Sequence, residues 1–318
     1  MTPPRLLVTG ATGFVGRWAL RHWRVMHPDV EVWACSEKPR PVDIEAHEYR
    51  QVDLRDVAAV RAWVAACRPK HVLHLAGIVG SAPLADHLAV NVIGTEALYT
   101  ALADGDRAGE LRVVQAGSAA VYGAARPDEL PITEKQPHRP ITPYGIGKLA
   151  QDHVADAMWR TRGLPVVRGC VFNLLGPGQP DTLVPMTFVR QLADVRRGAT
   201  DRLCVGQTSS RRDFVDVRDV VAAFDLLFEH GRPGEAYNIG SGRDVSIQEV
   251  IDELLRVSGV RVSMEVAPSR IRAADVPCVR ADVSKLTAET GWRPVVGLCE
   301  SLTAMWQECT GEAGSSES

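Results

Sequence analysis

The sequence predicts an α/β fold of the Rossmann type: a doubly wound parallel sheet joined to a smaller C-terminal substrate-binding lobe. Two observations predict it. Short apolar segments alternate with amphipathic segments along the first 171 residues, as strands and helices do in such sheets. A turn-rich break follows at 176–181 (GPGQPD), and beyond it the spacing of the elements is irregular.

The predicted strands are almost continuously apolar, as strands buried on both faces are; they cover 5–9, 31–35, 71–75, 112–116 and 165–171. The predicted helices are 16–27, 57–67, 88–103 and 144–162, then 185–197, 217–229 and 247–258. We expect 1–171, with parts of 210–240, to form a dinucleotide-binding domain. Residues 172–209 and 241–310 would form the substrate lobe, and 311–318 a disordered tail.

The composition narrows the class of protein. With 318 residues and 45% hydrophobic content, the chain can bury a large core. A formal charge of -3 gives no basic excess for nucleic acid. No apolar run of about 18 residues predicts a membrane span, and the N-terminus lacks a signal-peptide pattern. We therefore expect a cytoplasmic protein.

Cysteine and histidine usage predicts no metal site. The seven cysteines are scattered without a CxxC pair, which indicates reduced, mostly buried thiols. No histidine cluster has the spacing of metal ligands. His71 and His74 lie three residues apart on a predicted strand and so fall on opposite faces.

A glycine-rich segment lies between the first predicted strand and the first predicted helix. Its sequence from 10 to 16 is GATGFVG, with glycines at 10, 13 and 16. One glycine permits a tight turn, one lets the backbone approach a pyrophosphate, and one lets the helix pack against the strand. Free N–H groups at the helix start would face the phosphates. We therefore expect a dinucleotide site formed by Gly10, Thr12, Gly13, Phe14, Val15 and Gly16.

The end of the second predicted strand bears on the choice between NAD and NADP. An acidic residue there would hold the ribose 2′-OH of NAD. Ser36 occupies that position, followed within four residues by Glu37 and two cations. A small hydroxyl with nearby cations favours NADP, and Glu37 leaves NAD open. Asp53 and Leu54, which follow the third strand, are expected beside adenine.

Three residues have the spacing of proton-transfer machinery. Ser118 follows a predicted strand, and Tyr144 and Lys148 lie four residues apart on one face of a predicted helix. A nearby ammonium favours phenolate and lowers the tyrosine pKa from its usual value of about 10. Tyr144 would then exchange a proton near neutral pH, while Ser118 orients a substrate oxygen.

These residues resemble the extended short-chain dehydrogenase/reductase family, in particular its nucleotide-sugar epimerase/dehydratase branch. The resemblance covers nearly the whole chain, to about Leu302. The similar stretches are 8–16 (VTGATGFVG), 74–77 (HLAG), 91–95 (NVIGT), 118–123 (SAAVYG), 143–148 (PYGIGK), 172–173 (FN), 176–179 (GPGQ), 212–217 (RDFVDV), 237–242 (YNIGSG) and 291–294 (GWRP). Within the branch, two pairs of stretches look most like GDP-sugar enzymes: 176–181 followed by 188–193, and 269–277 followed by 282–285. They resemble the GDP-mannose 4,6-dehydratases and, more closely, the GDP-6-deoxy-4-keto-sugar reductases.

The resemblance implies further roles. Lys148 would also hold the nicotinamide ribose, and a homodimer through a helix bundle would be usual. The implied additional cofactor contacts are Leu75, Ala76, Gly77 and Tyr144. The implied substrate contacts, besides Ser118, are Asn173 and Arg212 on the diphosphate, with Val184, Arg190 and Arg272 on the rest of the nucleotide sugar.

One departure from the family pattern bears on the reaction. Sugar 4,6-dehydratases need an acidic residue beside the serine, where this chain has Ala119 and Ala120. We therefore expect an NAD(P)-dependent reductase of a nucleotide-linked 4-keto-6-deoxyhexose, with GDP the favoured nucleotide and Tyr144 the proton donor. The alternative is a nucleotide-sugar 4-epimerase with retained NAD. A dehydratase is disfavoured, as is a non-catalytic dinucleotide-binding protein, because the three proton-transfer residues are intact.

Overall fold

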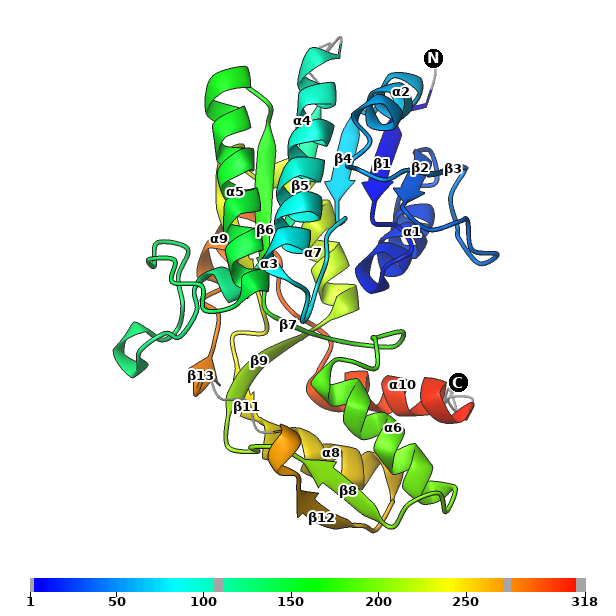
Figure 1. Cartoon of the computed structure of the whole chain (residues 1–318), viewed down its shortest axis with the longest axis vertical. Helices are drawn as coiled ribbons and strands as arrows, with labels where there is room; N and C mark the ends of the chain where they lie inside the picture. Colours follow the sequence, from blue (N-terminus) through cyan, green and yellow to red (C-terminus); the bar gives the residue numbers. More distant parts are fainter. Residues whose placement is uncertain (1–2, 106–110, 271–275, 313–318) are drawn as a thin grey trace.

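The computed structural model describes residues 3–105, 111–270 and 276–312. Its main sheet has seven strands in the order β10–β6–β5–β4–β1–β2–β3, and every pairing is parallel (Figure 1). The strands are β1 (Arg5–Thr9), β2 (Glu31–Ser36), β3 (Glu48–Gln51), β4 (His71–His74), β5 (Arg112–Ser118), β6 (Val166–Val171) and β10 (Ala236–Ile239). The strand order reverses between β1 and β4, so the predicted doubly wound fold is confirmed.

Helices cover both faces of this sheet. The helices on one face are α1 (Phe14–Met26), α7 (Val217–His230) and α9 (Ser284–Thr290). Those on the other face are α2 (Val57–Cys67), α4 (Gly94–Asp104) and α5 (Pro143–Arg162). Leu6 and Val8 of β1 are buried in the first layer and Leu7 in the second, because successive strand residues point to opposite faces. This double burial explains why the strands are apolar at nearly every position.

The helix predicted over 88–103 belongs to a longer helical stretch that has three consecutive segments. They are α3 (Leu84–His87), a π-helical turn (Leu88–Ile93) and α4. A π-helical turn holds an extra residue, so the apolar faces of α3 and α4 are out of phase. The apolar pattern of α4 therefore does not continue into α3, and the sequence analysis missed the start of the helical stretch at Leu84, directly after Pro83.

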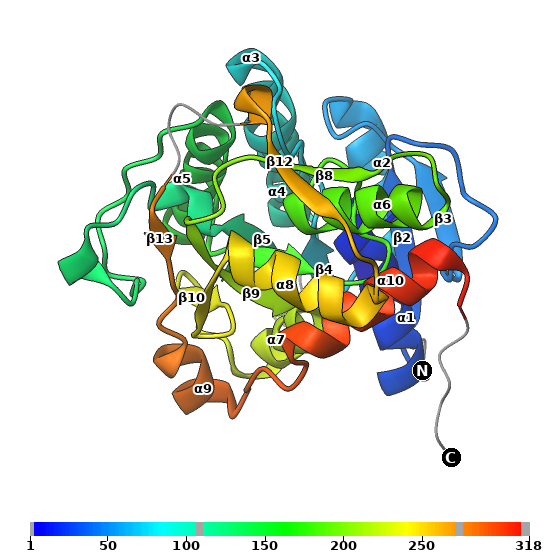
Figure 2. The same cartoon turned by 90° about the horizontal axis from the view of Figure 1, so that it is seen from below.

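The second lobe lies against the edge at which the strands of the main sheet end (Figures 1 and 2). A four-stranded sheet is built from β7 (Asn173–Leu175), β9 (Arg211–Asp216), β11 (Asp244–Ser246) and β13 (Cys278–Val279). Two further strands, β8 (Arg202–Val205) and β12 (Ser263–Val266), pair with each other. The helices of the lobe are α6 (Val184–Arg196), α8 (Ile247–Ser258) and α10 (Leu298–Thr310). They bury a separate apolar cluster that includes Leu192, Leu254 and Met305.

Two buried aspartates make hydrogen bonds that connect the second lobe to the domain of the main sheet. Asp213 of β9 accepts N–H bonds from Ser241, Gly242 and Ala281 at 2.6, 3.0 and 3.0 Å. Asp216 caps the N-terminus of α7 and accepts the hydroxyl proton of Ser301 in α10. Asp213 thereby fixes the chain at 241–242 and at Ala281 to β9. Asp216 fixes α10 to α7, which covers the main sheet.

Apart from the helix over 88–103, the predicted elements agree with the structure to within two residues, and the helices over 57–67 and 247–258 agree at both ends. The seven cysteines are free thiols, but only Cys35, Cys67 and Cys170 are buried, so the expectation of mostly buried thiols was wrong. Among the described residues, no helix combines the length and apolarity needed to cross a membrane. From residue 313 on, the predicted tail lies outside the described residues.

Candidate active site

The glycine loop connects β1 to α1 at the point where the strand order reverses. Gly10 has a φ of +67°, and a Cβ there would lie 2.7–2.8 Å from backbone atoms of Leu75 and Ala76. A Cβ on Gly16 would lie 2.5 Å from the carbonyl oxygen of Gly10. Both glycines are therefore required by close backbone contacts, and the loop lies directly on the chain that follows β4.

The start of α1 has the properties of an anion site. Gly13 is the N-cap and is exposed, with Thr12, Phe14 and Val15 half-buried around it. Neither a capping side chain nor an acidic residue occupies the first turn of this helix, all of which the structure describes. The first N–H groups of a helix have no intrahelical partner and carry partial positive charge. This cradle fits the pyrophosphate of a dinucleotide.

Ser36 ends β2 beside the glycine loop. Its Oγ lies 2.7 Å from Oγ1 of Thr12 and accepts a hydrogen bond from the backbone N–H of Lys38 at 3.1 Å. Glu37 and Lys38 are exposed beyond it. A small hydroxyl and an exposed lysine thus occupy the place where an acid would hold the 2′-OH of NAD.

The two residues expected beside adenine differ in their surroundings. Leu54 is buried against α4, where a Cβ on Gly94 would lie 2.9 Å from the Leu54 Cβ. Asp53 is half-exposed, and its two carboxylate oxygens accept hydrogen bonds of 2.6–3.0 Å from the Arg55 side chain. The Arg55 hydrogen bonds lower the pKa of Asp53, so the carboxylate is ionised and paired.

The chain after β4 lies beneath the glycine loop. Leu75 and Ala76 are half-buried there, and the N–H of Ala76 donates to Oγ1 of Thr9 at 3.2 Å. A Cβ on Gly77 would lie 3.0 Å from Oδ1 of Asn91, which accepts the Ile78 N–H at 2.8 Å. The π-helical turn that carries Asn91 therefore holds this segment in place, which fits the implied role of 75–77 at the cofactor.

The structure brings Ser118, Tyr144 and Lys148 to one place. Ser118 ends β5, and Tyr144 and Lys148 lie in the first turns of α5. The Ser118 side chain lies close enough to the Tyr144 hydroxyl to lower the pKa of Tyr144. Lys148 Nζ donates to the carbonyl oxygen of Ala116, two residues before Ser118, at 2.5 Å. The start of α5 is thus attached to the end of β5.

The expectation that Lys148 lowers the pKa of Tyr144 was wrong for this arrangement. Burial raises the pKa of Tyr144 above its usual value, and the nearby Ser118 side chain only partly offsets this. The Lys148 ammonium is turned toward Ala116 instead of toward the phenol. A raised pKa means that Tyr144 is protonated at neutral pH, which is the state that a proton donor needs.

Lys148 is held by a second acceptor, Gln151, which the sequence analysis did not identify. Burial lowers the pKa of Lys148 to about 8. Its ammonium donates to Oε1 of Gln151 at 2.6 Å. The signal in the sequence was a polar residue three positions after the lysine, hence on the same helical face.

Hydrogen bonds continue from Gln151 into the core. Its Nε2 lies 2.9 Å from Oγ1 of Thr95 and 3.2 Å from Nε2 of His74. The His74 Nδ1 lies 2.7 Å from Oγ1 of Thr9, the last residue of β1 before the glycine loop. Burial lowers the pKa of His74 to about 3, so the ring is neutral. Lys148 and the glycine loop are therefore joined through one buried chain of polar groups.

Of the residues expected at the substrate, Asn173 and Arg212 lie on adjacent strands. Nδ2 of Asn173 on β7 donates to the carbonyl oxygen of Asp213 on β9 at 3.2 Å. Nη1 of Arg212 donates to the carbonyl oxygens of Arg211 and Val276 at 2.8 and 2.6 Å. These contacts orient both side chains at the junction of the two lobes.

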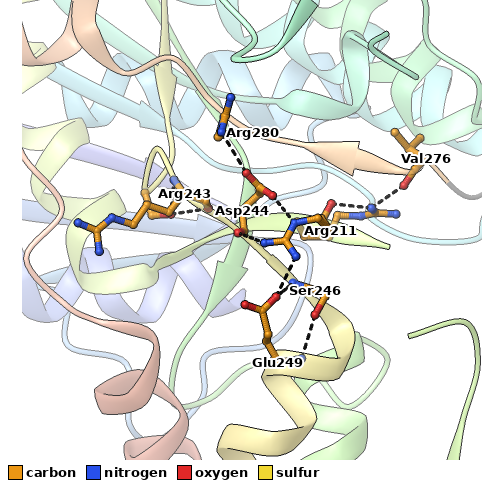
Figure 3. A network of polar contacts seen from close by, with 9 residues as sticks. Arg211, Arg243, Asp244, Ser246, Glu249, Val276 and Arg280 are labelled. Atoms are coloured by element: carbon orange, nitrogen blue, oxygen red, sulfur yellow. Dashed lines mark hydrogen bonds and ion pairs between the residues drawn. The ribbon is translucent and has the colours of Figure 1, made fainter. Parts of the chain in front are cut away.

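A network of ion pairs surrounds this stretch of β9 (Figure 3). Arg211 pairs with Asp244 and with Glu249, the latter at 3.0 Å, and Arg280 reaches Asp244 at 3.4 Å. The Arg211 hydrogen bond lowers the pKa of Asp244. Because neighbouring strand residues point to opposite faces, Arg212 points away from the face on which this network lies.

The other expected substrate residues are not brought to Arg212 by any contact that the structure describes. Val184 begins α6 and is half-buried. Arg190 is exposed and pairs with Asp181 at 2.6 Å, a hydrogen bond that raises the pKa of Arg190. Arg272 lies outside the described residues.

A loop of the second lobe packs on the helix that begins the dinucleotide site. Trp18 Nε1 of α1 donates to the carbonyl oxygen of Pro177 at 2.8 Å. A Cβ on Gly176 would lie 3.6 Å from Cζ of Phe14. The turn-rich break at 176–181 therefore joins the two lobes instead of separating them.

A doubly wound sheet with an anion cradle at its point of reversal, and a serine, tyrosine and lysine beside it, defines an extended short-chain dehydrogenase/reductase, an NAD(P)-dependent enzyme. Comparison with known proteins places it within this class. Residues 7–305 match the family model of GDP-mannose 4,6 dehydratase, and the chain belongs to that family.

Several relatives are similar over almost their entire length. The chain is 33% identical over 306 residues to the GDP-6-deoxy-D-mannose reductase of Pseudomonas aeruginosa, covering 95% of each chain. It is 31% identical to a UDP-glucose 4-epimerase of Streptomyces lividans, covering 91% of each. The structure of RMD from Pseudomonas aeruginosa complexed with NADPH superposes with a TM-score of 0.86 at 30% identity, covering 98% of this chain and 100% of that chain. The resemblance to the nucleotide-sugar branch is thereby confirmed.

We expect Gly10→Ala to weaken NADPH binding by about fivefold or more. Displacing packed backbone costs about 1–3 kcal/mol, and about 1.4 kcal/mol corresponds to tenfold. Gly163→Ala is the matched control, since Gly163 also has a positive φ, +62°, but nothing lies within 4 Å of its Cβ position. Titration of NADPH fluorescence would measure both affinities. Wild-type affinity in Gly10→Ala would contradict the assignment of the loop.

We expect substitutions of Gln151 to move the basic limb of the pH–activity profile in opposite directions. Gln151→Leu removes an acceptor from the ammonium, so the pKa of Lys148 falls below its present value of about 8 and activity is lost at lower pH. Gln151→Glu adds a negative charge, which raises that pKa and extends activity to higher pH. Profiles of kcat/KM that coincide for the two variants would show that Gln151 serves only packing.

Proposed function

We propose that the protein is an NADPH-dependent reductase of a GDP-linked 4-keto-6-deoxyhexose, with Tyr144 as proton donor to the oxygen at C4. The observation that carries the chemistry is the burial of Tyr144 beside Ser118, which raises the pKa of the phenol and keeps it protonated. The substrate class rests on the 33% identity to a GDP-6-deoxy-D-mannose reductase over 95% of both chains.

Ser118, Tyr144 and Lys148 together account for the reduction of a carbonyl group. The bound nicotinamide supplies the hydride for C4. Ser118 orients the carbonyl oxygen, and Tyr144 gives it a proton as negative charge develops there. Lys148, fixed by Ala116 and Gln151, holds the nicotinamide ribose in this proposal.

The turn after Ser118 disfavours a dehydratase. Ala119 and Ala120 form a short 3₁₀ segment there, and the Ala120 N–H donates to Oγ of Ser118 at 3.2 Å. A methyl group cannot take the C5 proton that elimination of water requires. The turn therefore holds the Ser118 oxygen in a fixed position for the substrate.

The second lobe supplies the groups for the nucleotide sugar in this proposal. Arg212 and Asn173 bind the diphosphate, because a guanidinium presents paired N–H donors that match phosphate oxygens. Val184, Arg190 and Arg272 contact the rest of the nucleotide sugar. The dinucleotide domain is then 1–171 with parts of 210–240, and the substrate lobe is 172–209 with 241–310.

We propose NADP as the cofactor and a homodimer as the assembly. The hydroxyl of Ser36 and the nearby Lys38 favour a 2′-phosphate, and the similar RMD structure is complexed with NADPH. Exposed apolar side chains on the π-helical turn and at the start of α5, namely Ile93 and Ile146, support pairing through these helices. A monomer mass in light scattering of the purified protein would contradict the homodimer.

The second candidate is a nucleotide-sugar 4-epimerase, which the 31% identity to a UDP-glucose 4-epimerase supports. An epimerase keeps its NAD and shows no net consumption of NADPH. Incubation with GDP-, UDP-, dTDP- and CDP-sugars, keto forms included, with NADPH or NADH separates the two. Interconversion of 4-epimers without NADPH oxidation would replace the reductase proposal.

We expect Tyr144→Phe to lower turnover by about 10²–10⁴-fold, the usual contribution of a positioned proton donor. NADPH affinity should stay within a few-fold, because the glycine loop is untouched. Tyr237→Phe is the control, since the Tyr237 hydroxyl donates to Glu289 of α9 at 2.6 Å, and its removal should preserve turnover. Loss of NADPH absorbance with a GDP-4-keto-6-deoxyhexose measures both variants. Wild-type turnover in Tyr144→Phe would overturn its role.

We expect Ser36→Asp to shift the ratio of kcat/KM for NADPH and NADH toward NADH by at least about tenfold. Like charges about 4 Å apart near a surface repel by about 4 kcal/mol, more than the about 1.4 kcal/mol that tenfold requires. Ser36→Asn is the uncharged control and should keep the wild-type preference. An unchanged ratio in Ser36→Asp would mean that Ser36 does not face the 2′ position.

A further inference from the structure

Two imidazoles and one carboxylate meet where the end of α1 lies beside α7. Nε2 of His22 is 2.8 Å from Oδ2 of Asp225. Nε2 of His27 is 2.8 Å from the same oxygen and 2.9 Å from Oδ1. One donor atom from each of the three residues lies within 4.8 Å of the other two. Three metal-ligating groups thus converge from two helices.

Their surroundings fix the rings while leaving access for water. The His27 ring stacks on Trp23 with centroids 6.1 Å apart, and the His22 ring meets the edge of the same indole at 5.2 Å. The side chains of His22, His27 and Asp225 are 20%, 33% and 20% exposed. Burial tends to raise the pKa of Asp225, but hydrogen bonds from both histidines outweigh it and the pKa is lowered. The carboxylate is therefore ionised at neutral pH.

We propose that His22, His27 and Asp225 form a binding site for one divalent transition-metal ion, with Zn²⁺ the expected occupant. The ligands are Nε2 of each histidine and a carboxylate oxygen, a donor set that suits Zn²⁺. Water completes the coordination on the exposed side. The site lies at the opposite end of α1 from the glycine loop, about 20 Å away for a helix of this length.

The geometry needs only a small adjustment to hold the ion. Bonds of about 2.0–2.1 Å in a tetrahedral site place neighbouring ligand atoms about 3.3 Å apart, whereas the nitrogens now lie 2.8 Å from the carboxylate oxygen. Half-exposed side chains at the end of a helix can open by this amount through rotation. On metal binding each Nε2 gives up the proton that it now donates to Asp225, and a ring that moves this proton to Nδ1 turns the lone pair of Nε2 to the metal.

The ion would act as a clamp between helices and not in the reaction. α1 and α7 cover the same face of the sheet and share one apolar cluster (Figure 1). A metal bridging His22 and His27 to Asp225 adds coordinate bonds between them, which stabilises the folded chain. The inference does not depend on the proposed substrate.

Titration with Co²⁺ tests the site on the full-length protein after treatment with a chelator and desalting. We expect one Co²⁺ per chain, visible d–d bands of a four- or five-coordinate ion, and displacement by Zn²⁺. Intense near-ultraviolet bands from thiolate would instead indicate binding at cysteine and overturn the assignment. Zn²⁺ should also raise the Tm of the wild type.

Three variants provide the contrast. His22→Gln, His27→Gln and Asp225→Asn should each weaken metal binding at least about 100-fold, since even outer contacts of a metal site contribute about 10–100-fold. His230→Gln is the matched control, because His230 is exposed and lies 3.6 Å from Glu229 outside the cluster. It should bind as the wild type does.

The Tm of each metal-free variant shows whether it is folded. Only the folded variants are compared with the wild type in metal binding. His22→Gln is the second route if Asp225→Asn fails to fold. No stoichiometric Co²⁺ binding by the wild type, or equal binding by wild type and a folded ligand variant, would overturn the proposal. Either result would reduce the cluster to hydrogen bonds between α1 and α7.

Discussion

The backbone of Gly10 touches the backbone of Leu75 and Ala76, and the arrangement of the candidate site depends on this contact. A side chain at position 10 would push β1 away from the chain that follows β4. The contact fixes where α1 begins, and so directs its free N–H groups into the point at which the strand order reverses. It also holds the segment after β4 against the π-helical turn, whose Asn91 binds Ile78 on both its N–H and its carbonyl oxygen.

Burial of Tyr144 and Lys148 sets their pKa values for proton transfer more than any charge beside the phenol does. Tyr144 is neutral because its surroundings disfavour phenolate, and Lys148 titrates near physiological pH because its surroundings disfavour ammonium. The polar chain through Gln151 and His74 supplies partners that a buried cation requires. Buried polar groups without partners cost about 1–3 kcal/mol each, so these residues are needed together.

Features set by local sequence were predictable, and features set by distant contacts were not. The glycine loop and the i, i+4 spacing of Tyr144 and Lys148 follow from adjacent residues, and the structure places them as expected. The cluster at Asp225 joins residues 198 positions apart, with histidines at i and i+5, a spacing that indicates no shared helical face. The pKa of Tyr144 was predicted with the wrong sign, because burial and the direction of the Lys148 ammonium depend on the folded core.

The hydrogen bond from Trp18 to the carbonyl oxygen of Pro177 has a consequence for how such proteins evolve. A piece of the substrate lobe is completed by a helix of the other lobe, so the two are not interchangeable modules. Recombination that joined this dinucleotide domain to the lobe of a relative would have to carry residues 176–179 with α1, or alter Phe14 and Trp18 in concert. The smallest unit that can be inherited intact is therefore a domain together with the loop that rests on it.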